Sequence, residues 1–333
     1  MSLEEHKMAD VSVIVPAYRA AFCIGQALAS VAAQTLKPGE VIVVDDGSDD
    51  GTFEAAEAMR EKMNGVELRV IAQQNKGAGA ARNHALREAK LTFVAFLDAD
   101  DEWMAEKIER SMAALHGTNH VLVAHDFIRV EIDGSENTVE CARRFQQASD
   151  PYIGLFRQGF IATSSVVCRR AEVVEVGGFD EALATAQDFE LWLKLLARDG
   201  ATFSIFPNVL SRYHVTGSSI TSFTARRLAC SLDIARRHAP GLFDLLFRIL
   251  AVHFEAMIAY RRGGFPFKAL LIGLQLPWNL LAISLASGQT SPRAATPQWL
   301  VLALLAWVVV GFGAYVYRFR DLVHRGLDLL EQL

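Results

Sequence analysis

Residues 93–103 read Phe93-Val94-Ala95-Phe96-Leu97-Asp98-Ala99-Asp100-Asp101-Glu102-Trp103 and place five apolar residues directly before three carboxylates in four positions. A short apolar run followed by polar residues predicts a strand buried in a parallel sheet. In open α/β sheets, ligands bind at the carboxyl ends of such strands, where these acids would lie. Crowded carboxylates repel one another, and a hard divalent cation relieves the repulsion. We therefore expect Asp98 and Asp100 to share one Mg²⁺ or Mn²⁺.

The same acids also allow a structural interpretation that needs no ligand. An acidic turn would join the strand to a helix, and Asp101 would cap that helix, which would run through Trp103 and Ile108 to about Leu115. The stretch alone favours neither interpretation.

Alternating strands and helices precede this stretch. Strands are predicted at 11–15, 41–44 and 68–71, and helices at 21–34 and 53–63. Pro16 is expected to end the first strand, because proline cannot continue the hydrogen-bond ladder. Strand, helix, strand is the right-handed βαβ unit. The pattern predicts an α/β fold with a Rossmann-like, mostly parallel sheet.

Polar residues follow these strands at the edge where a ligand would bind. Asp45-Asp46-Gly47 is a turn sequence, but Asp46 could also hydrogen-bond a nucleotide base or ribose. Tyr18, at the neighbouring strand end, could stack on the base, an interaction of ~1–3 kcal/mol in nucleic-acid complexes. A glycine-rich loop, Lys76-Gly77-Ala78-Gly79, opens a helix expected at 80–89, whose N-terminus would face the same edge. Lys76 is a candidate contact to a diphosphate or sugar.

Four segments occur in an order that identifies a resemblance. They are Val13-Ile14-Val15-Pro16-Ala17-Tyr18, Val43-Val44-Asp45-Asp46-Gly47-Ser48, Gly77-Ala78-Gly79-Ala80-Ala81-Arg82-Asn83 and Phe96-Leu97-Asp98-Ala99-Asp100-Asp101. Over residues 10–220 the chain resembles the inverting glycosyltransferases of family 2, which have the GT-A fold. The resemblance implies a nucleotide-diphosphate-sugar donor, with Tyr18 and Asp46 on the base, and with Asp98 and Asp100 holding a metal on the diphosphate. The candidate donor-binding residues are then Pro16, Tyr18, Asp46, Lys76 and Asp98.

A second chemical centre is expected at Asp188. Apolar residues at helical spacing, Trp192 among them, follow it and place its carboxylate in the first turn of a helix. There it could complement the helix dipole or act as the general base for the acceptor hydroxyl, a role that contributes roughly 10²–10⁴-fold in rate. The resemblance implies the base. The family has Glu where this chain has Gln187, which leaves acceptor recognition open. Glu190, about 200° around the helix from Asp188, is expected to face solvent.

Three other segments carry weaker signals. Residues 160–168 bring small hydroxyl side chains that could line an acceptor pocket or simply begin a strand. His214 could approach the metal or diphosphate, or be structural. Residues 131–150 are polar and are expected to form an irregular surface loop.

Composition and charge exclude several classes of protein. The net charge of −5 gives no sign of a nucleic-acid partner. The four cysteines are far apart, which predicts reduced thiols rather than a zinc site or a disulfide framework. The first ten residues are polar and unlike a signal peptide. Residues 241–333 hold eight Lys or Arg and five Asp or Glu, a net +3 that leaves −8 for residues 1–240.

The C-terminal part is expected to meet a membrane. Residues 269–292 and 294–317 hold no charged side chain, and 298–317 is long and apolar enough to span a ~30 Å hydrocarbon core. Residues 269–286 could span or lie in the interface. If both runs span, the cations on either side of the pair place the catalytic domain in the cytoplasm, at the inner membrane, by the positive-inside rule. These cations are Arg261, Arg262, Lys268, Arg318 and Arg320.

The sequence thus predicts a GT-A catalytic domain at 1–225, a helical connector at 226–264, a membrane segment of one or two transmembrane helices at 265–320 and a short tail at 321–333. We expect inverting, metal-assisted sugar transfer to a hydroxyl or phosphate of a lipid-linked or cell-envelope glycan. Alternatives are a polyprenyl-phosphate sugar transferase, and a sugar-nucleotide-binding scaffold that would not need Asp188. A processive polysaccharide synthase is disfavoured, because the sequence has no Gln-x-x-Arg-Trp segment. The sugar, base and linkage are not identified.

Overall fold

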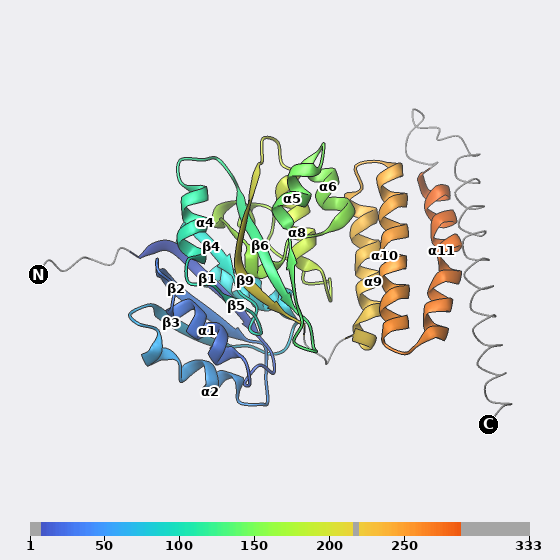
Figure 1. Ribbon diagram of the computed structural model, residues 1–333. Coiled ribbons are helices and arrows are strands. Elements are labelled where there is room, and N and C mark those ends of the chain that lie inside the picture. Colours follow the sequence, from blue (N-terminus) through green and yellow to red (C-terminus); the bar gives the residue numbers. More distant parts are fainter. Residues whose placement is uncertain (1–7, 216–219, 288–333) are drawn as a thin grey trace, which may run out of the picture. The chain divides into compact units, whose positions relative to one another are not determined.

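The computed structural model describes residues 8–215 and 220–287 (Figure 1). These residues form two compact units. One contains residues 8–215 and 229–238, and the other contains residues 220–228 and 239–287.

A nine-stranded sheet forms the centre of the first unit, in the order β3-β2-β1-β4-β8-β6-β9-β5, with β7 paired to β6. The strands are β1 (Ala9–Ala17), β2 (Pro38–Asp45), β3 (Glu67–Ala72), β4 (Phe93–Phe96), β5 (Glu102–Trp103), β6 (Leu122–Val130), β7 (Glu136–Val139), β8 (Val167–Arg169) and β9 (Phe203–His214). The half from β3 to β4 is parallel, as predicted. Beyond β4 the sheet is mixed, because β8 is antiparallel to both β4 and β6, and β5 is antiparallel to β9. The prediction of a mostly parallel sheet therefore holds only for the first half.

Helices cover both faces of the parallel half. The helices of the first unit are α1 (Ile24–Ala32), α2 (Thr52–Glu57), α3 (Ala78–Glu88), α4 (Lys107–Leu115), α5 (Cys141–Gln147), α6 (Pro151–Gln158), α7 (Arg170–Glu175) and α8 (Gln187–Leu196), with 3₁₀ turns η1 (Arg60–Lys62) and η2 (Thr163–Ser165). Val13 and Val15 pack in one core with Leu28 of α1. Since alternate side chains of a strand point to opposite faces, the intervening Ile14 lies under the other layer. Both faces are buried, which explains the continuous apolar runs.

Pro16 lies inside β1 rather than after it. Its register partner is Val44 of β2, and β1 continues to Ala17. The pairing of β1 with β4 ends at Ile14. The proline can therefore stay in the strand, since no β4 ladder bond is needed at that position.

The predicted helix through Trp103 is wrong. Glu102 and Trp103 form β5, and the helix α4 begins only at Lys107. The backbone N–H of Trp103 donates to Ser30 Oγ (3.1 Å), and its indole N–H donates to the Ser164 carbonyl (2.8 Å). These bonds hold the segment extended against β9, so Asp101 caps no helix.

Residues 131–150 are also more regular than expected. A turn at Gly134 (φ +80°) leads back into β7, which pairs with β6, and α5 follows. The polar composition reflects exposure, and the ladder along β6 supplies the hydrogen bonds.

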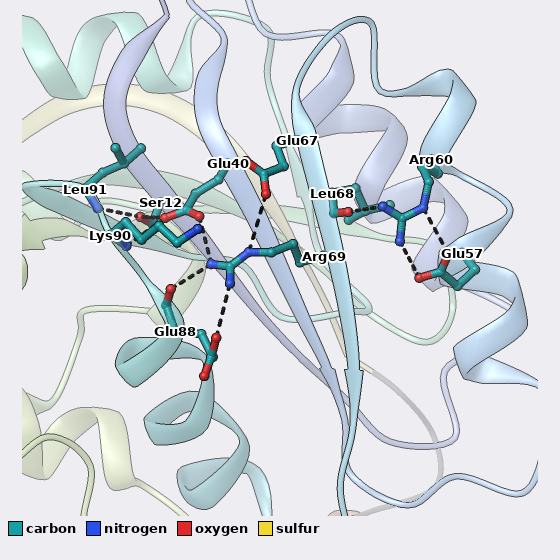
Figure 2. Close-up of polar contacts among 10 residues, drawn as sticks. All are labelled: Ser12, Glu40, Glu57, Arg60, Glu67, Leu68, Arg69, Glu88, Lys90 and Leu91. Carbon is teal, nitrogen blue, oxygen red and sulfur yellow. Dashed lines mark hydrogen bonds and ion pairs between the residues drawn. The ribbon is translucent and has the colours of Figure 1, made fainter.

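The amino ends of the parallel strands are tied together by a buried carboxylate (Figure 2). Glu40 of β2 accepts hydrogen bonds from Ser12 Oγ (2.6 Å), the Lys90 backbone N–H (2.8 Å) and Arg69 Nη2 (2.8 Å). Arg69 also donates to the carbonyl of Glu88 at the end of α3 (2.7 Å). The network fixes the C-terminal end of α3 against the sheet.

The second unit is helical. It is built from the first part of α9 (Ile220–His238), α10 (Leu242–Arg262) and α11 (Pro266–Ser287), and α10 packs against α11 (Figure 1). Ile249 and Val252 of α10 are buried. His253 Nε2 lies 3.1 Å from Asn279 Nδ2 of α11.

In the described ranges, no helix is both long and apolar enough to cross a membrane. The predicted run 269–286 belongs to α11 and is not confirmed as a span. The other predicted span, 298–317, and the tail 321–333 lie outside the described residues.

Candidate active site

The carboxyl ends of β1, β2 and β4 meet at one edge of the sheet. Ala17 pairs with Asp45, and Ile14 pairs with Phe96. Tyr18, Asp46 and Asp98 therefore follow neighbouring strands on the same edge, as the sequence predicted. This edge is where a ligand of an open α/β sheet binds.

Asp46 is buried and bonded to the neighbouring loop. One carboxylate oxygen accepts from Gln73 Nε2 (2.8 Å) and the Lys76 N–H (2.9 Å), and the other accepts from the Gly77 N–H (2.7 Å). Gly47 permits this approach, since a Cβ there would lie 2.9 Å from the Asn75 nitrogen. Asp46 thus shapes the loop before α3, and only its remaining lone pairs could reach a base.

Tyr18 is a half-exposed ring, 49% accessible, at the same edge. The Arg19 guanidinium lies 5.5 Å from its centroid and makes two 2.9 Å hydrogen bonds to Asp49. A base could therefore stack only on ring surface that Arg19 leaves open. Lys76 has an exposed side chain, so its ammonium is available at the rim.

Arg82 of α3, for which the sequence predicted no role, is bonded to one of the central acids. Its Nη2 lies 2.6 Å from Asp98 Oδ1, and its guanidinium lies 5.4 Å from the Phe179 ring centroid. Burial disfavours its charge, but Asp98 and then Asp188 keep the pKa of Arg82 above its ordinary value. The guanidinium thus bonds to the predicted donor carboxylate, and the charge of the predicted base also favours its protonated form. The signal for it was present, as the only cation in the glycine-rich segment after Lys76.

Asp100 and Asp101 are crowded together with Asp98. Burial and then the charge of Asp98 raise the pKa of Asp100 to about 6. Burial, Asp98 and Asp100 raise the pKa of Asp101 well above its usual range. Ser164 Oγ donates to Asp101 and accepts from the Asp98 N–H (3.1 Å). Two hydroxyls of η2, those of Thr163 and Ser164, therefore bond to acids, and β8 begins only at Val167. A role of residues 160–168 in lining an acceptor pocket stays a prediction.

The carboxylates of Asp98 and Asp100 could supply only some of the ligands that a hard divalent cation needs. Within residues 8–215 and 220–287, no three His, Cys, Asp or Glu side chains come together as a metal site. Two carboxylates suffice for Mg²⁺ or Mn²⁺ when substrate phosphates and water complete the shell. The residues present fit such an ion if it arrives with a diphosphate.

His214 is held by the segment of β5. Its Nε2 lies 2.9 Å from Glu102 Oε1, and its backbone N–H donates to Asp101 Oδ1 (3.0 Å). His214 and Glu102 line a cavity of about 320 Å³ together with Asp100 and the exposed Phe22. The cavity leaves open space beside Asp100, although His214 itself is engaged with Glu102.

Asp188 lies in the first turn of α8, as predicted. Its Oδ2 accepts from Thr163 Oγ1 (2.7 Å). The residue before the helix, Ala186, has φ +60° and ψ +26°, a left-handed conformation that costs a non-glycine residue about 1–2 kcal/mol. Such strain is retained where surrounding contacts impose it. The hydrogen bond and the strained entry fix where the carboxylate points.

One expectation about α8 needs correction. Glu190 does not face solvent: it is 2% accessible, and it lies 3.1 Å from both His238 Nε2 of α9 and Lys194 Nζ. Gln187 donates through Nε2 to the Leu183 carbonyl (2.7 Å), a bond that the carboxylate of Glu could not make. The amide thus serves the loop before α8, and its Cγ lies 3.4 Å from where a Cβ on Gly79 would be.

Comparison with known proteins identifies the family of this chain. The family described as "Glycosyl transferase family 2" matches residues 12–169. A putative teichuronic acid biosynthesis glycosyltransferase of Bacillus subtilis, TuaG, is 30% identical over 224 residues, which cover 64% of this chain and 81% of that protein. The chain belongs to glycosyltransferase family 2.

One further relative and one solved structure resemble this family 2 glycosyltransferase. WfgD of Escherichia coli, a UDP-Glc:alpha-D-GlcNAc-diphosphoundecaprenol beta-1,3-glucosyltransferase, is 29% identical over 259 residues, 78% of this chain and 96% of that protein. The mannosyltransferase PcManGT of Pyrobaculum calidifontis, solved with GDP-Man and Mn²⁺, has a TM-score of 0.56 and 21% identity, covering 93% of this chain and 83% of that one. The latter likeness concerns the fold, which is the GT-A fold.

Proposed function

We propose that this enzyme transfers a sugar from a nucleotide-diphosphate donor to a lipid-linked acceptor, with inversion, and that Asp188 is the general base. The observation that carries the proposal is that two neighbouring residues of η2 contact both groups: Thr163 bonds to Asp188, and Ser164 bonds to the backbone of Asp98, which also holds Arg82. An acceptor hydroxyl beside Asp188 would give up its proton as it attacks the sugar.

The chain's own residues divide the work. Asp98 and Asp100 would hold Mg²⁺ or Mn²⁺ on the donor, and the bound metal would neutralise charge on the departing diphosphate. Thr163 keeps Asp188 Oδ2 engaged, so the other oxygen is left to accept a proton. The nucleotide would lie along the part of the edge that is bordered by Pro16, Tyr18, Asp46 and Lys76. His214 is a secondary candidate for a contact with the diphosphate.

The acceptor class is inferred from the relatives and from the chain's C-terminal part. WfgD acts on a diphosphoundecaprenol-linked sugar, as its name states. This chain carries an uncharged apolar run at 298–317, and tethering at a bilayer raises the effective concentration of a lipid-held acceptor. We therefore place the enzyme at the cytoplasmic face of the membrane, in assembly of a cell-envelope polysaccharide.

The test of the base compares two acids of α8. Asp188→Asn should retain donor binding and lower transfer by ~10²–10⁴-fold, because only proton acceptance is removed. Glu190→Gln is the matched control and should retain transfer, since Glu190 contacts Lys194 and His238 rather than the site. A dead Glu190→Gln beside an active Asp188→Asn would show that the assignment is wrong.

The tests of donor and acceptor use the full chain in vesicles. A panel of nucleotide sugars identifies the donor by hydrolysis. Asp100→Ala should abolish the part of donor binding that depends on Mn²⁺, and equal nucleotide affinity in the presence of a chelator would count against the metal. A soluble acceptor used with the same kcat/KM as its lipid-linked form would overturn the acceptor class.

A further inference from the structure

The turn between α10 and α11 exposes large apolar side chains next to one another in the chain. Phe267 is 68% accessible, Ile258 50%, Leu271 44% and Phe265 40%. Single exposed apolar residues are ordinary, but four of them around one turn, within residues 258–271, are typical of an interaction surface. The group is called here the α10–α11 tip and comprises residues 258–271.

Basic side chains share the tip with these residues. Arg261, Arg262 and Lys268 are exposed. Lys268 Nζ lies 4.9 Å from the Phe265 ring centroid and 5.9 Å from that of Tyr260. No Asp or Glu occurs in the sequence between Glu255 and Asp321. The tip therefore combines apolar and cationic groups and contains no acid.

The tip is held in shape by its own backbone. The Phe265 N–H donates to the Tyr260 carbonyl (2.8 Å), and the Gly263 N–H donates to the Ala259 carbonyl (3.0 Å). Gly264 adopts φ +79°, which closes the end of α10. A surface that is already formed loses little conformational entropy when it binds.

We propose that the α10–α11 tip is a docking surface for an anionic lipid bilayer, with Phe265 and Phe267 entering the interface and the three cations contacting lipid phosphates. Exposed aromatic residues beside Lys and Arg are the composition that binds at such an interface. This surface lies outside the proposed active site and does not depend on the reaction assigned to it.

Charge disfavours two other occupants, a second copy of the tip itself and residues 288–333. A second copy of the tip would bring its three cations against three more. Residues 288–333 contribute Arg293, Arg318 and Arg320 before their first acid, Asp321. Lipid phosphates, in contrast, supply the anions directly above the apolar chains.

The experiment titrates the full-length protein with vesicles of neutral phosphatidylcholine, and with vesicles that also contain anionic phosphatidylglycerol. A charge variant and an apolar variant are each paired with a control that removes the same groups elsewhere. The charge pair is Arg261→Gln/Arg262→Gln/Lys268→Gln against Lys62→Gln/Arg87→Gln/Lys90→Gln in the first unit. The apolar pair is Phe267→Ser against Phe243→Ser, which is 63% exposed at the other end of α10.

The charge variant should bind anionic vesicles about 100-fold more weakly, since each Lys or Arg near an anionic leaflet strengthens binding about fivefold. Phe267→Ser should weaken binding about tenfold. Both controls should bind like the wild type, and all variants should keep the wild-type thermal midpoint. Amide exchange over residues 258–271 should slow on addition of anionic vesicles.

Equal binding of the wild type and both tip variants would overturn the proposal, because residues outside the tip would then carry the association. Equal binding to neutral and anionic vesicles would do the same. Exchange over 258–271 that stays the same on addition of anionic vesicles would also overturn it. Protection over 258–271 that increases with protein concentration, in the absence of lipid, would assign the tip to a second copy.

Discussion

Replacement of Arg82 by Met tests whether the protein carries its own counter-charge for the acids of the site. Arg82 is 7% accessible and is bonded to Asp98 at 2.6 Å. A hydrogen bond between charged groups contributes about 1.5–3 kcal/mol. Methionine keeps the contact with Phe179 and removes the buried Nε, which has no partner among the described residues. We expect a net loss of about 2 kcal/mol, or about 4–8 °C in thermal midpoint for a unit of this size.

The same change should strengthen metal binding. Two unit charges 4 Å apart interact by about 4 kcal/mol at an effective dielectric constant near 20. A divalent ion at Asp98 is repelled by the guanidinium even at twice that distance. Mn²⁺ without nucleotide should therefore bind Arg82→Met at least about tenfold more tightly, and the thermal shift caused by Mn²⁺ should be larger than in the wild type.

The assay is thermal unfolding with and without Mn²⁺, supported by calorimetry. Arg87→Met is the control, because Arg87 lies on the exposed side of the same helix. If Arg82→Met unfolds at the wild-type temperature and binds Mn²⁺ no better, then Arg82 does not balance the acids and the reasoning is refuted.

Three other changes probe the supports of the site. Ala186→Gly should raise the free energy of unfolding by about 0.5–1 kcal/mol in denaturant titrations, because the φ of +60° suits glycine. The same change should slow transfer by loosening Asp188. A less stable variant would show that Ala186 is not strained. Gln187→Glu should lower stability by about 1–3 kcal/mol through loss of the bond to the Leu183 carbonyl, and a neutral effect would mean that the loop rearranges. Burial alone would raise the pKa of Glu40, but its bonds to Ser12, Lys90 and Arg69 outweigh burial and hold the pKa below 4.5. A carboxylate with a depressed pKa stabilises the fold at pH values above the unfolded-state pKa. Glu40→Gln should therefore lower the free energy of unfolding by about 2 kcal/mol at pH 7, and this loss should shrink as the pH falls below about 4.5. A loss that is the same at every pH would argue against a charged Glu40.

The sequence predicted the parallel half of the sheet well because its strands are buried on both faces. Residues 41–44 are a continuous apolar run, residues 11–15 are apolar except for Ser12, and the structure extends both only by a few residues. The edge position of Asp98 and the helix start at Asp188 followed from the same patterns. These features depend on local sequence, so local reasoning was enough.

The antiparallel half was not predictable in the same way. β5 has two residues and β8 has three, too few for any periodicity to be visible. Their place is set by partners far along the chain, such as Ser164 for Trp103. The prediction that Glu190 faces solvent was wrong for a related reason. Helical geometry gives its angle from Asp188, but not that His238, 48 residues later, covers that side of α8.

The element that joins fold and site is α3, whose sequence gives little sign of this role. Its C-terminal end is fixed by Arg69 and Glu40, through the Glu88 carbonyl and the Lys90 N–H. Its first turn packs through Gly79 against the loop that leads to Asp188. Between these ends, Arg82 reaches Asp98. A helix held at both ends brings its guanidinium to Asp98 and its first turn to the loop before Asp188. We therefore expect the relative position of the proposed donor carboxylate and the proposed base to depend on the opposite edge of the sheet.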